Sequence, residues 1–460
     1  MKHLLFTIFL FTQVSFSIEA QTNEWPYVNY TYAKAFMYNL DSKLRSKYQI
    51  VKDEKIDKTA ISEGVLLTKK QAEKVIRITA KDVRALLSGL SKCFIPHHAI
   101  VFYNKENKPV ASFMPSFECE AIKLKPAKPF SKFDAELTDG EIAEQLTILN
   151  EYEQIIKELG FPVLKSPSAY KKYSKKLEKN TAYKLKLIER TGVKQLKSVD
   201  NQRFDLSGIA SYNNKVFVVA DKKWNNRIYR VDTTFNAFTI EPVIPVCPAD
   251  KIDFEGIDVC GEQIYLIEEW YDNVYKLRPD SCNLEKIELK WEDFDIYRSE
   301  WGNKGLEGIA VDCDNEVLYL AKERQPRRLF EIDLKSGKIA EPFIKTLGVQ
   351  REGHDISDMK FENGYLYILE RGRGMVTRIN TETKESLSYS FQHVVLKDGK
   401  RIFDNGHPEY GMAEAILLTK DQIWIGIDNN GDPVSLYGKT MGLKENNHTV
   451  ILIFERPEGF

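Results

Sequence analysis

Residues 306–334 read LEGIAVDCDNEVLYLAKERQPRRLFEIDL, and this stretch decides the fold class. It contains three segments, GIAVD, VLYLAKE and RLFEIDL, in which apolar and polar residues alternate and between which polar residues lie. Alternation with a period of two is typical of half-buried β-strands. The stretch therefore predicts three successive antiparallel strands, the first of which starts at an acidic residue, Glu307.

The same pattern recurs four more times along the chain. The other copies lie at residues 206–232, 254–280, 356–380 and 413–457. If Gly208, Gly256, Gly308, Asp358 and Ala415 are taken as equivalent, the steps between copies are 48, 52, 50 and 57 residues. A spacing near 50 residues, with several short strands in each unit, is typical of propeller blades. More polar segments such as residues 286–291 are expected to add a fourth strand to each unit.

We therefore predict a mainly β protein, a five-bladed β-propeller preceded by a small α+β domain. Residues 183–190 alternate like a strand but have no unit of their own. We expect them to complete the last blade and so to close the ring without open strand edges. A sixth blade would result if residues 191–199 or 391–403 hid a degenerate unit.

The predicted domain boundaries follow from these patterns. They are a signal peptide at 1–20, an α+β domain at 21–170, a linker at 171–182 and the propeller at 183–460. In the α+β part, residues 70–78, 81–90 and 141–160 have helical spacing, and residues 98–104 and 109–121 resemble a hairpin. The lysine-rich residues 171–180 are interpreted as a linker or a solvated helix.

The first twenty residues predict export. A basic start precedes the apolar run LLFTIFLF at 4–11, and small residues follow, with cleavage expected after Ser17 or, preferably, Ala20. No cysteine follows the cleavage zone, so a lipid anchor is not indicated, and we expect a secreted or periplasmic protein. A formal net charge of −1 provides no global attraction to nucleic acid, and no later stretch is apolar enough to span a bilayer.

Six cysteines in an exported chain favour disulfides. Cys93 and Cys119 lie almost opposite one another if the predicted hairpin turns near residues 106–107. A disulfide between them is the first interpretation, and a zinc site with His97 or His98 is the second. A bridge between Cys282 and Cys313 would join neighbouring blades, although sequence alone leaves the pairing open.

Acidic residues recur at two places in each repeat. They stand where the first predicted strand starts and where the second ends, and antiparallel pairing brings these two places to the same face of a propeller. The starts carry Asp205, Asp253, Glu255, Glu307, Asp355, Asp358 and Glu414, and the ends carry Asp221, Glu268, Glu269, Glu323, Glu370 and Asp428. We expect a ring of carboxylates around one mouth of the axis.

Crowded carboxylates repel one another and need compensation. Calcium, which takes six to eight oxygen ligands, would supply it. Basic residues after the second strands would neutralise some acids or hold an anionic group; they are Lys222, Lys223, Arg324, Arg327, Arg328, Arg371 and Arg373. The alternative is that each acid caps a turn or joins two blades.

The repeated starts EGIA and EGID, the LAKERQPRRLFEID segment and residues 414–432 resemble the phytase-like, esterase-like propellers of exported proteins and the related SdiA-regulated propellers. The resemblance covers about residues 200–460 and implies calcium and the hydrolysis of ester or phosphoester bonds. Carried over residue by residue, it implies the metal ligands Glu255, Glu307, Glu323, Asp358, Glu370, Glu414 and Asp428. Ser207 departs from this pattern and puts the first repeat's contribution in doubt.

For a hydrolase, one carboxylate would act as general base, Glu307 is a catalytic candidate, and His354, next to Asp355, is a candidate acid–base group. Arg324 and Arg371 would stabilise developing negative charge on an anionic or ester small-molecule substrate. The rival function is a non-enzymatic binding propeller in which calcium is structural. A weaker likeness, through residues 357–359 and the EG starts, is to calcium-dependent lactonase propellers.

Overall fold

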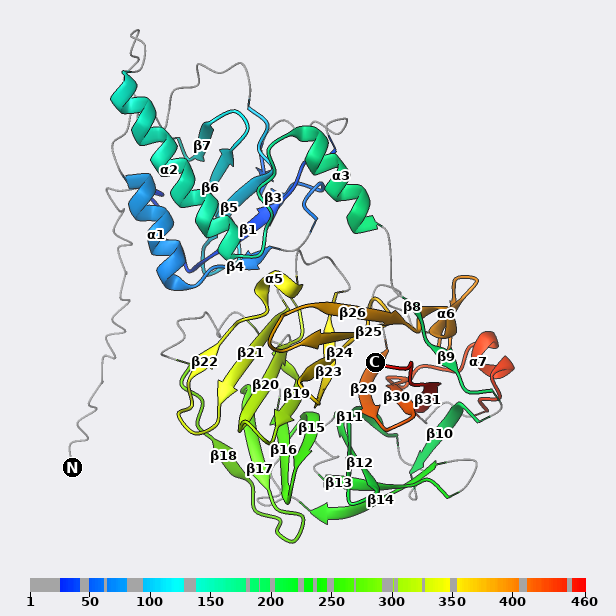
Figure 1. Cartoon of the computed structure of the whole chain (residues 1–460). Helices are drawn as coiled ribbons and strands as arrows, with labels where there is room; N and C mark the ends of the chain where they lie inside the picture. Colours follow the sequence, from blue (N-terminus) through cyan, green and yellow to red (C-terminus); the bar gives the residue numbers. More distant parts are fainter. Residues whose placement is uncertain are drawn as a thin grey trace, which may run out of the picture.

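The computed structural model describes most of the chain between residues 25 and 460 (Figure 1). The described residues are 25–41, 49–61, 64–80, 94–127, 138–178, 183–189, 191–198, 203–221, 227–234, 238–245, 252–268, 270–291, 301, 305–324, 327–347, 354–404, 412–444 and 449–460. The predicted signal peptide, the predicted helix at 81–90, Lys222 and Lys223 lie outside them. Among the described residues, no helix is long and apolar enough to cross a membrane.

The N-terminal part contains a five-stranded sheet in the order β4-β1-β5-β6-β7. Its strands are β1 (Tyr32–Met37), β4 (Val65–Leu66), β5 (His98–Tyr103), β6 (Pro109–Ser116) and β7 (Ala121–Lys125), and β2 (Val51–Lys52) pairs with β3 (Lys55–Ile56). The helices are α1 (Lys69–Ala80), α2 (Asp139–Glu158) and α3 (Pro167–Glu178). The predicted helices at 70–78 and 141–160 and the predicted hairpin are confirmed, and the lysine-rich stretch is helical to Glu178.

Helices α1 and α2 lie side by side against this sheet (Figure 1). Val75 and Ile78 of α1 share one buried cluster with Tyr152 of α2 and Phe113 of β6. Thr138 and Glu141 form a capping box at the start of α2, which satisfies backbone N–H groups that the first turn leaves without partners.

In the remaining part, each of the three middle repeats forms its own sheet, in which its four strands are antiparallel and consecutive strands are neighbours. One contains β15 (Phe254–Cys260), β16 (Gln263–Glu268), β17 (Asn273–Leu277) and β18 (Glu285–Ile287). The next contains β19 (Leu306–Asp312), β20 (Val317–Lys322), β21 (Arg328–Asp333) and β22 (Ile339–Ala340). A third contains β23 (Ile356–Glu362), β24 (Tyr365–Glu370), β25 (Met375–Asn380) and β26 (Ser386–Ser390).

The first and last repeats belong to one continuous nine-stranded sheet. The first repeat forms β11 (Asp205–Tyr212), β12 (Lys215–Asp221), β13 (Arg227–Asp232) and β14 (Phe238–Pro245), and the last forms β29 (Ala413–Leu418), β30 (Gln422–Ile427) and β31 (Val450–Glu455). Strand β10 (Val193–Ser198) lies between them, because it pairs in parallel with β14 and antiparallel with β31. The three strands predicted for each repeat are confirmed.

The segment predicted to complete the last sheet is divided between two sheets. β9 (Lys186–Leu187) pairs with β31, as expected, and the Lys186 ammonium lies 2.8 Å from the Glu455 carboxylate. However, β8 (Tyr183–Lys184) pairs in parallel with β26 of the preceding sheet. Residues 193–198 form the joining strand β10, while residues 391–403 contribute α6 (Gln392–Val395) and the hairpin of β27 (Leu396–Lys397) and β28 (Lys400–Arg401). The two remaining helices are α5 (Ile344–Leu347) and α7 (Leu436–Thr440).

The first strand of each repeat lies beside the first strand of the next. β11 contacts β15, β15 contacts β19, β19 contacts β23, β23 contacts β29, and β29 returns to β11. Glycine permits this close approach: a Cβ atom on Gly256 would lie 2.7 Å from the carbonyl oxygen of Glu307 in the next strand. Buried apolar clusters fill the space between neighbouring sheets, as where Val219 of β12 meets Ile257 of β15.

A β-bulge recurs at the same place in all five first strands. The pairing register with the second strand shifts just before Gly208, Gly256, Gly308, Asp358 and Ala415. The extra residue at each shift is Ser207, Glu255, Glu307, Ser357 or Glu414. A bulge changes the direction of the side chain at the extra residue. The side chain at this position therefore departs from the regular alternation of the strand in every repeat.

One disulfide joins Cys260, at the end of β15, to Cys313, just after β19. It links two neighbouring sheets, but the predicted partner of Cys313 was Cys282, so that pairing is wrong. Cys119 and Cys282 are also disulfide-bonded. Cys93, the predicted partner of Cys119, lies outside the described residues.

We predict that Gly256→Ala weakens the ring, because the new methyl group must displace the backbone of β19. The expected loss in unfolding free energy is about 1–3 kcal/mol, measured by chemical denaturation. Gly140→Ala is the control, since nothing lies within 4 Å of the Cβ that it adds. Equal stability of Gly256→Ala and the wild type would contradict the close approach of β15 and β19.

Candidate functional site

In each repeat, the start of the first strand and the end of the second strand lie on the same face of the propeller. Asp205 at the start of β11 pairs with Asp221 at the end of β12, and Phe254 pairs in the same way with Glu268. The predicted convergence of these two places is therefore confirmed by the strand register. We call this face the mouth.

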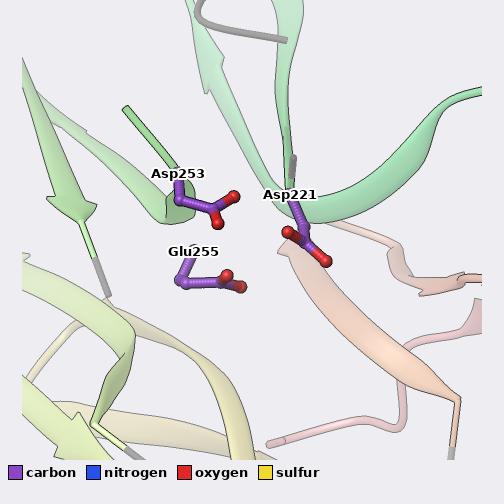
Figure 2. Close-up of side chains that lie close together, drawn as sticks. All are labelled: Asp221, Asp253 and Glu255. Carbon is purple, nitrogen blue, oxygen red and sulfur yellow. The ribbon is translucent and has the colours of Figure 1, made fainter. Parts of the chain in front are cut away.

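Three carboxylates meet at the mouth between the first two repeats (Figure 2). Asp221 is the last residue of β12, while Asp253 and Glu255 stand on either side of Phe254, the first residue of β15. One carboxylate oxygen from each lies within 4.8 Å of the others, and all three side chains are half-buried. We call these residues the acidic triad. It is the one group among the described residues that brings three such ligand atoms together.

Arg371 forms ion pairs with carboxylates from the third, fourth and fifth repeats. Its guanidinium lies 2.7 Å from Glu414, 3.5 Å from Asp355 and 3.7 Å from Glu307, and it also contacts Glu323. Burial alone would lower the pKa of Arg371, but Glu307, Glu414 and Glu255 raise it above its ordinary value. We call Arg371 and these four carboxylates the Arg371 cluster. Since Glu255 contributes to the rise in the pKa of Arg371, the charge of the acidic triad acts on this cluster.

Arg324 strengthens the same cluster. It lies 2.5 Å from the Glu323 carboxylate and 3.5 Å from that of Asp355. Burial raises the pKa of Asp355, and the charge of Arg324 opposes that rise. Both arginines predicted to stabilise a substrate's negative charge are thus engaged by the protein's own carboxylates.

Glu370 lies outside this site, although it was predicted as a metal ligand. Its carboxylate contacts Arg327, accepts a hydrogen bond from Arg373 at 2.9 Å and accepts another from Thr377 at 2.6 Å. Burial would raise the pKa of Glu370, but the two arginines hold it at about 2. By register, Arg371 rather than Glu370 occupies the place of Glu323 and Asp221 in the other repeats.

Asp358 was also predicted as a metal ligand, but its side chain does not lie at the mouth. In the strand register it takes the position that Gly208, Gly256 and Gly308 have in the first three repeats. Its fully buried carboxylate accepts hydrogen bonds from the backbone N–H groups of Met359 at 2.7 Å and Ile416 at 2.8 Å. Lys360 lies 3.2 Å from Asp358 and donates to the carbonyl of Ile257 on β15. Burial raises the pKa of Asp358 to about 7. Asp358 thus joins β23 to β29.

The other predicted residues border the mouth without joining the acidic triad. Asp428 accepts hydrogen bonds from the backbone N–H of Asn430 at 2.9 Å and the Thr449 hydroxyl at 3.3 Å. Arg203 pairs with Asp205 at 2.6 Å and, at longer range, with Asp428. His354 is half-buried and directly precedes Asp355.

Two bulge positions carry serine in place of glutamate. The Ser207 hydroxyl donates to the carbonyl of Phe254 at 2.5 Å, and the Ser357 hydroxyl donates to that of Ala413 at 2.7 Å. Each serine therefore fastens its strand to the next repeat. The glutamates at the other three bulges lie at the mouth: Glu307 and Glu414 contact Arg371, and Glu255 belongs to the acidic triad.

Comparison with known proteins agrees with the arrangement of these sheets. Residues 184–397 match the SdiA-regulated family. The matched stretch runs from β8 to β27 and is of a propeller type, and the β-rich part of the chain is a β-propeller. The SdiA-regulated match makes no statement about the acidic triad's ligand.

Similar solved structures have low sequence identity. A structural genomics protein from Bacteroides thetaiotaomicron VPI-5482 is 11% identical with a TM-score of 0.34, over 57% of this chain and 75% of that one. A chain of the nidogen/laminin complex is 11% identical with a TM-score of 0.32, over 49% and 73%. The U3-55K structure is 10% identical with a TM-score of 0.30, over 52% and 63%.

The sequence contained a signal for the Arg371 cluster that the prediction did not use. Second strands end in AD, EE, KE, ER and ID at residues 220–221, 268–269, 322–323, 370–371 and 427–428. Aligning the last letter places Arg371 among four acids. An arginine in a ring of carboxylates is the arrangement that their repulsion favours.

We predict that Arg371→Gln destabilises the protein by about 3–5 kcal/mol near pH 8, because buried carboxylates lose their cation. Without Arg371, the pKa of Glu414, already raised by burial, rises further above its unfolded value. A carboxyl whose folded pKa is raised binds more protons when folded, so stability increases as pH falls. The loss should therefore shrink toward pH 5 in denaturation measurements.

Arg278→Gln is the control for this prediction. Arg278 pairs with Asp280 and Glu262 at the surface, so its replacement should change stability little at either pH. A destabilisation by Arg371→Gln that is the same at pH 5 and pH 8 would show that the mouth carboxylates do not depend on it.

Proposed function

We propose that the mouth binds calcium at the acidic triad and that the protein is an exported, calcium-dependent hydrolase of an ester or phosphoester. The observation that carries the proposal is the convergence of Asp221, Asp253 and Glu255 next to the Arg371 cluster. Two candidate functions differ in the role of this calcium, which is catalytic in a hydrolase and structural in a binding propeller.

The donor set of the triad fits calcium. Calcium is bound by oxygen at 2.3–2.6 Å, so two ligands on opposite sides of one ion are about 5 Å apart. The triad oxygens, all within 4.8 Å of one another, are compatible with that limit. The three side chains come from two repeats, and their half-burial leaves access for water or substrate oxygen as further ligands.

The balance of charge in the site also favours a cation. Four carboxylates lie around Arg371, those of Glu307, Glu323, Asp355 and Glu414, and the three of the acidic triad converge within 4.8 Å. Arg324 and Arg371 lie among the first four of these carboxylates. Like charges at this density raise one another's pKa and disfavour the ionised state, and a divalent cation relieves that cost.

Bound calcium would polarise the substrate oxygen and lower the pKa of a water molecule. Glu307 then serves as the general base that takes a proton from the attacking water, since its carboxylate lies at the mouth beside Arg371. Arg371 and Arg324 stabilise the negative charge that develops on the ester oxygen. His354, which directly precedes Asp355, is proposed to donate a proton to the leaving alkoxide and to regain one from Glu307. Water and ester thereby give an acid and an alcohol.

A binding propeller with structural calcium is the second candidate. It is favoured by the engagement of Arg371 and Arg324 with carboxylates, which reduces the positive charge that either arginine offers to a substrate anion. Calcium would then clamp β12 to β15 and leave the mouth as a recognition surface.

We also propose five blades and export. Five first strands contact one another in a closed sequence, and β10 joins the first and last repeats, which supports five units. The Cys260–Cys313 bridge suits an oxidising compartment such as the periplasm or the exterior. Export also agrees with the basic and apolar order of residues 1–20.

We predict that calcium raises the melting temperature relative to EGTA and that Asp253→Asn removes this shift. Ligand at 100 times its Kd stabilises a protein by about 2.7 kcal/mol, enough for a clear shift. Asp280→Asn, at an exposed carboxylate, is the control and should keep the shift. An equal calcium response in wild type and Asp253→Asn would remove the triad as the site.

Hydrolysis separates the two candidates. With p-nitrophenyl phosphate and p-nitrophenyl acetate as substrates, the hydrolase should release nitrophenol with calcium and not with EGTA. Glu307→Gln should retain the thermal shift, since Glu307 is outside the triad, and lose turnover. A calcium-dependent thermal shift without turnover on either substrate would select the binding propeller.

A further inference from the structure

A small cavity lies next to the mouth, between the end of β24 and the start of β29. It measures about 50 Å³. One water molecule needs roughly 10–15 Å³ of such space, so the cavity has room for about four waters or for a short chain of carbon atoms.

Apolar side chains form most of its lining. They come from α6, β27, β29, β30 and residues next to these elements and include Phe391, Val395, Leu396, Ile402, Met412 and Ile427. Phe391, Ile402 and Ile427 are buried, whereas Val395, Leu396 and Met412 are partly exposed. An apolar cavity of this kind holds water poorly and favours an apolar group.

Arg371 connects the cavity to the mouth. It lines the cavity, while its guanidinium contacts Glu414, Asp355, Glu307 and Glu323. A molecule with an apolar end in the cavity would therefore place its other end among the carboxylates of the mouth.

The wall of the cavity is held in place by backbone contacts. The carbonyl of Gly374 accepts hydrogen bonds from the backbone N–H groups of Phe391 at 2.8 Å and Gln392 at 3.1 Å. Gly374 has a positive φ of 58°, and a Cβ there would lie 2.9 Å from Gln392, so only glycine suits this contact. The loop after β24 and helix α6 thus form a preorganised wall.

We infer that this cavity binds the short acyl group of a carboxylic ester whose ester bond lies at the mouth. The inference rests on the proposed hydrolase function and makes it more specific. It assigns the protein to small carboxylic esters of about four acyl carbons, rather than to phosphoesters of polar sugars.

The test compares p-nitrophenyl acetate with p-nitrophenyl butyrate in the full-length protein. Each buried methylene contributes about fourfold, so butyrate, which has two more methylenes than acetate, should exceed it about fifteenfold in kcat/KM. Leu396→Phe narrows the cavity and should bring the butyrate and acetate values of kcat/KM close together. Leu436→Phe makes the same change at a side chain that is 70% exposed and should keep the preference. A preference that is absent, or unchanged in Leu396→Phe, would overturn the inference.

A second measurement tests binding in the cavity separately from hydrolysis. N-(4-nitrophenyl)butyramide resists hydrolysis, and its binding is followed by calorimetry. It should bind wild type and Leu436→Phe and bind Leu396→Phe at least tenfold more weakly. This pattern without turnover on any ester would retain the cavity and reject the hydrolase. Turnover without this pattern would retain the hydrolase and reject the assigned cavity.

Discussion

The close approach of the first strands around one axis is the constraint on which the rest of this propeller depends. Gly256 lets β15 lie against β19, and the bulge beside it turns Glu255 toward the mouth. The same bulge turns Glu307 and Glu414 to that face. Packing that buries apolar sheet faces therefore also concentrates negative charge, and the protein must compensate for it.

Compensation differs around the mouth. Between the later repeats it is internal, because Arg371 and Arg324 lie among the carboxylates. Between the first and second repeats, three carboxylates converge within 4.8 Å. An arginine that is part of the chain is always present, whereas a metal can be gained or lost. The convergence of three carboxylates is the reason to propose an exchangeable cation at the acidic triad.

Much of the fold was predictable from the sequence, because strand alternation and the 50-residue spacing arise from local pattern. The exceptions involve short pairings. The alternation of residues 183–190 predicted a strand, but it contains no information on its partner, and the two halves of the segment join different sheets. The partner of Cys313 likewise depended on which turn lies nearest across two sheets.

The site was predicted in outline and missed in its details. Adjacent residues of a strand face opposite sides, so taking Glu370 instead of Arg371 as the repeat's end reversed the side to which the side chain points. Asp358 was aligned with the glycines, and that position faces the neighbouring strand rather than the mouth. Which acids come within a few ångströms of one another depends on distances between repeats, and these are not visible in a linear pattern.

Strand β10 has a consequence for how the ring is completed in time. Its partner on one side, β31, follows roughly 250 residues later in the chain, since Val193 pairs with Leu452. At about 5–20 residues per second, a ribosome needs roughly 10–50 s to make that stretch. Throughout this interval one edge of the newborn β10 offers unpaired backbone groups, which a chaperone bound to the nascent chain would cover until the last strand is made.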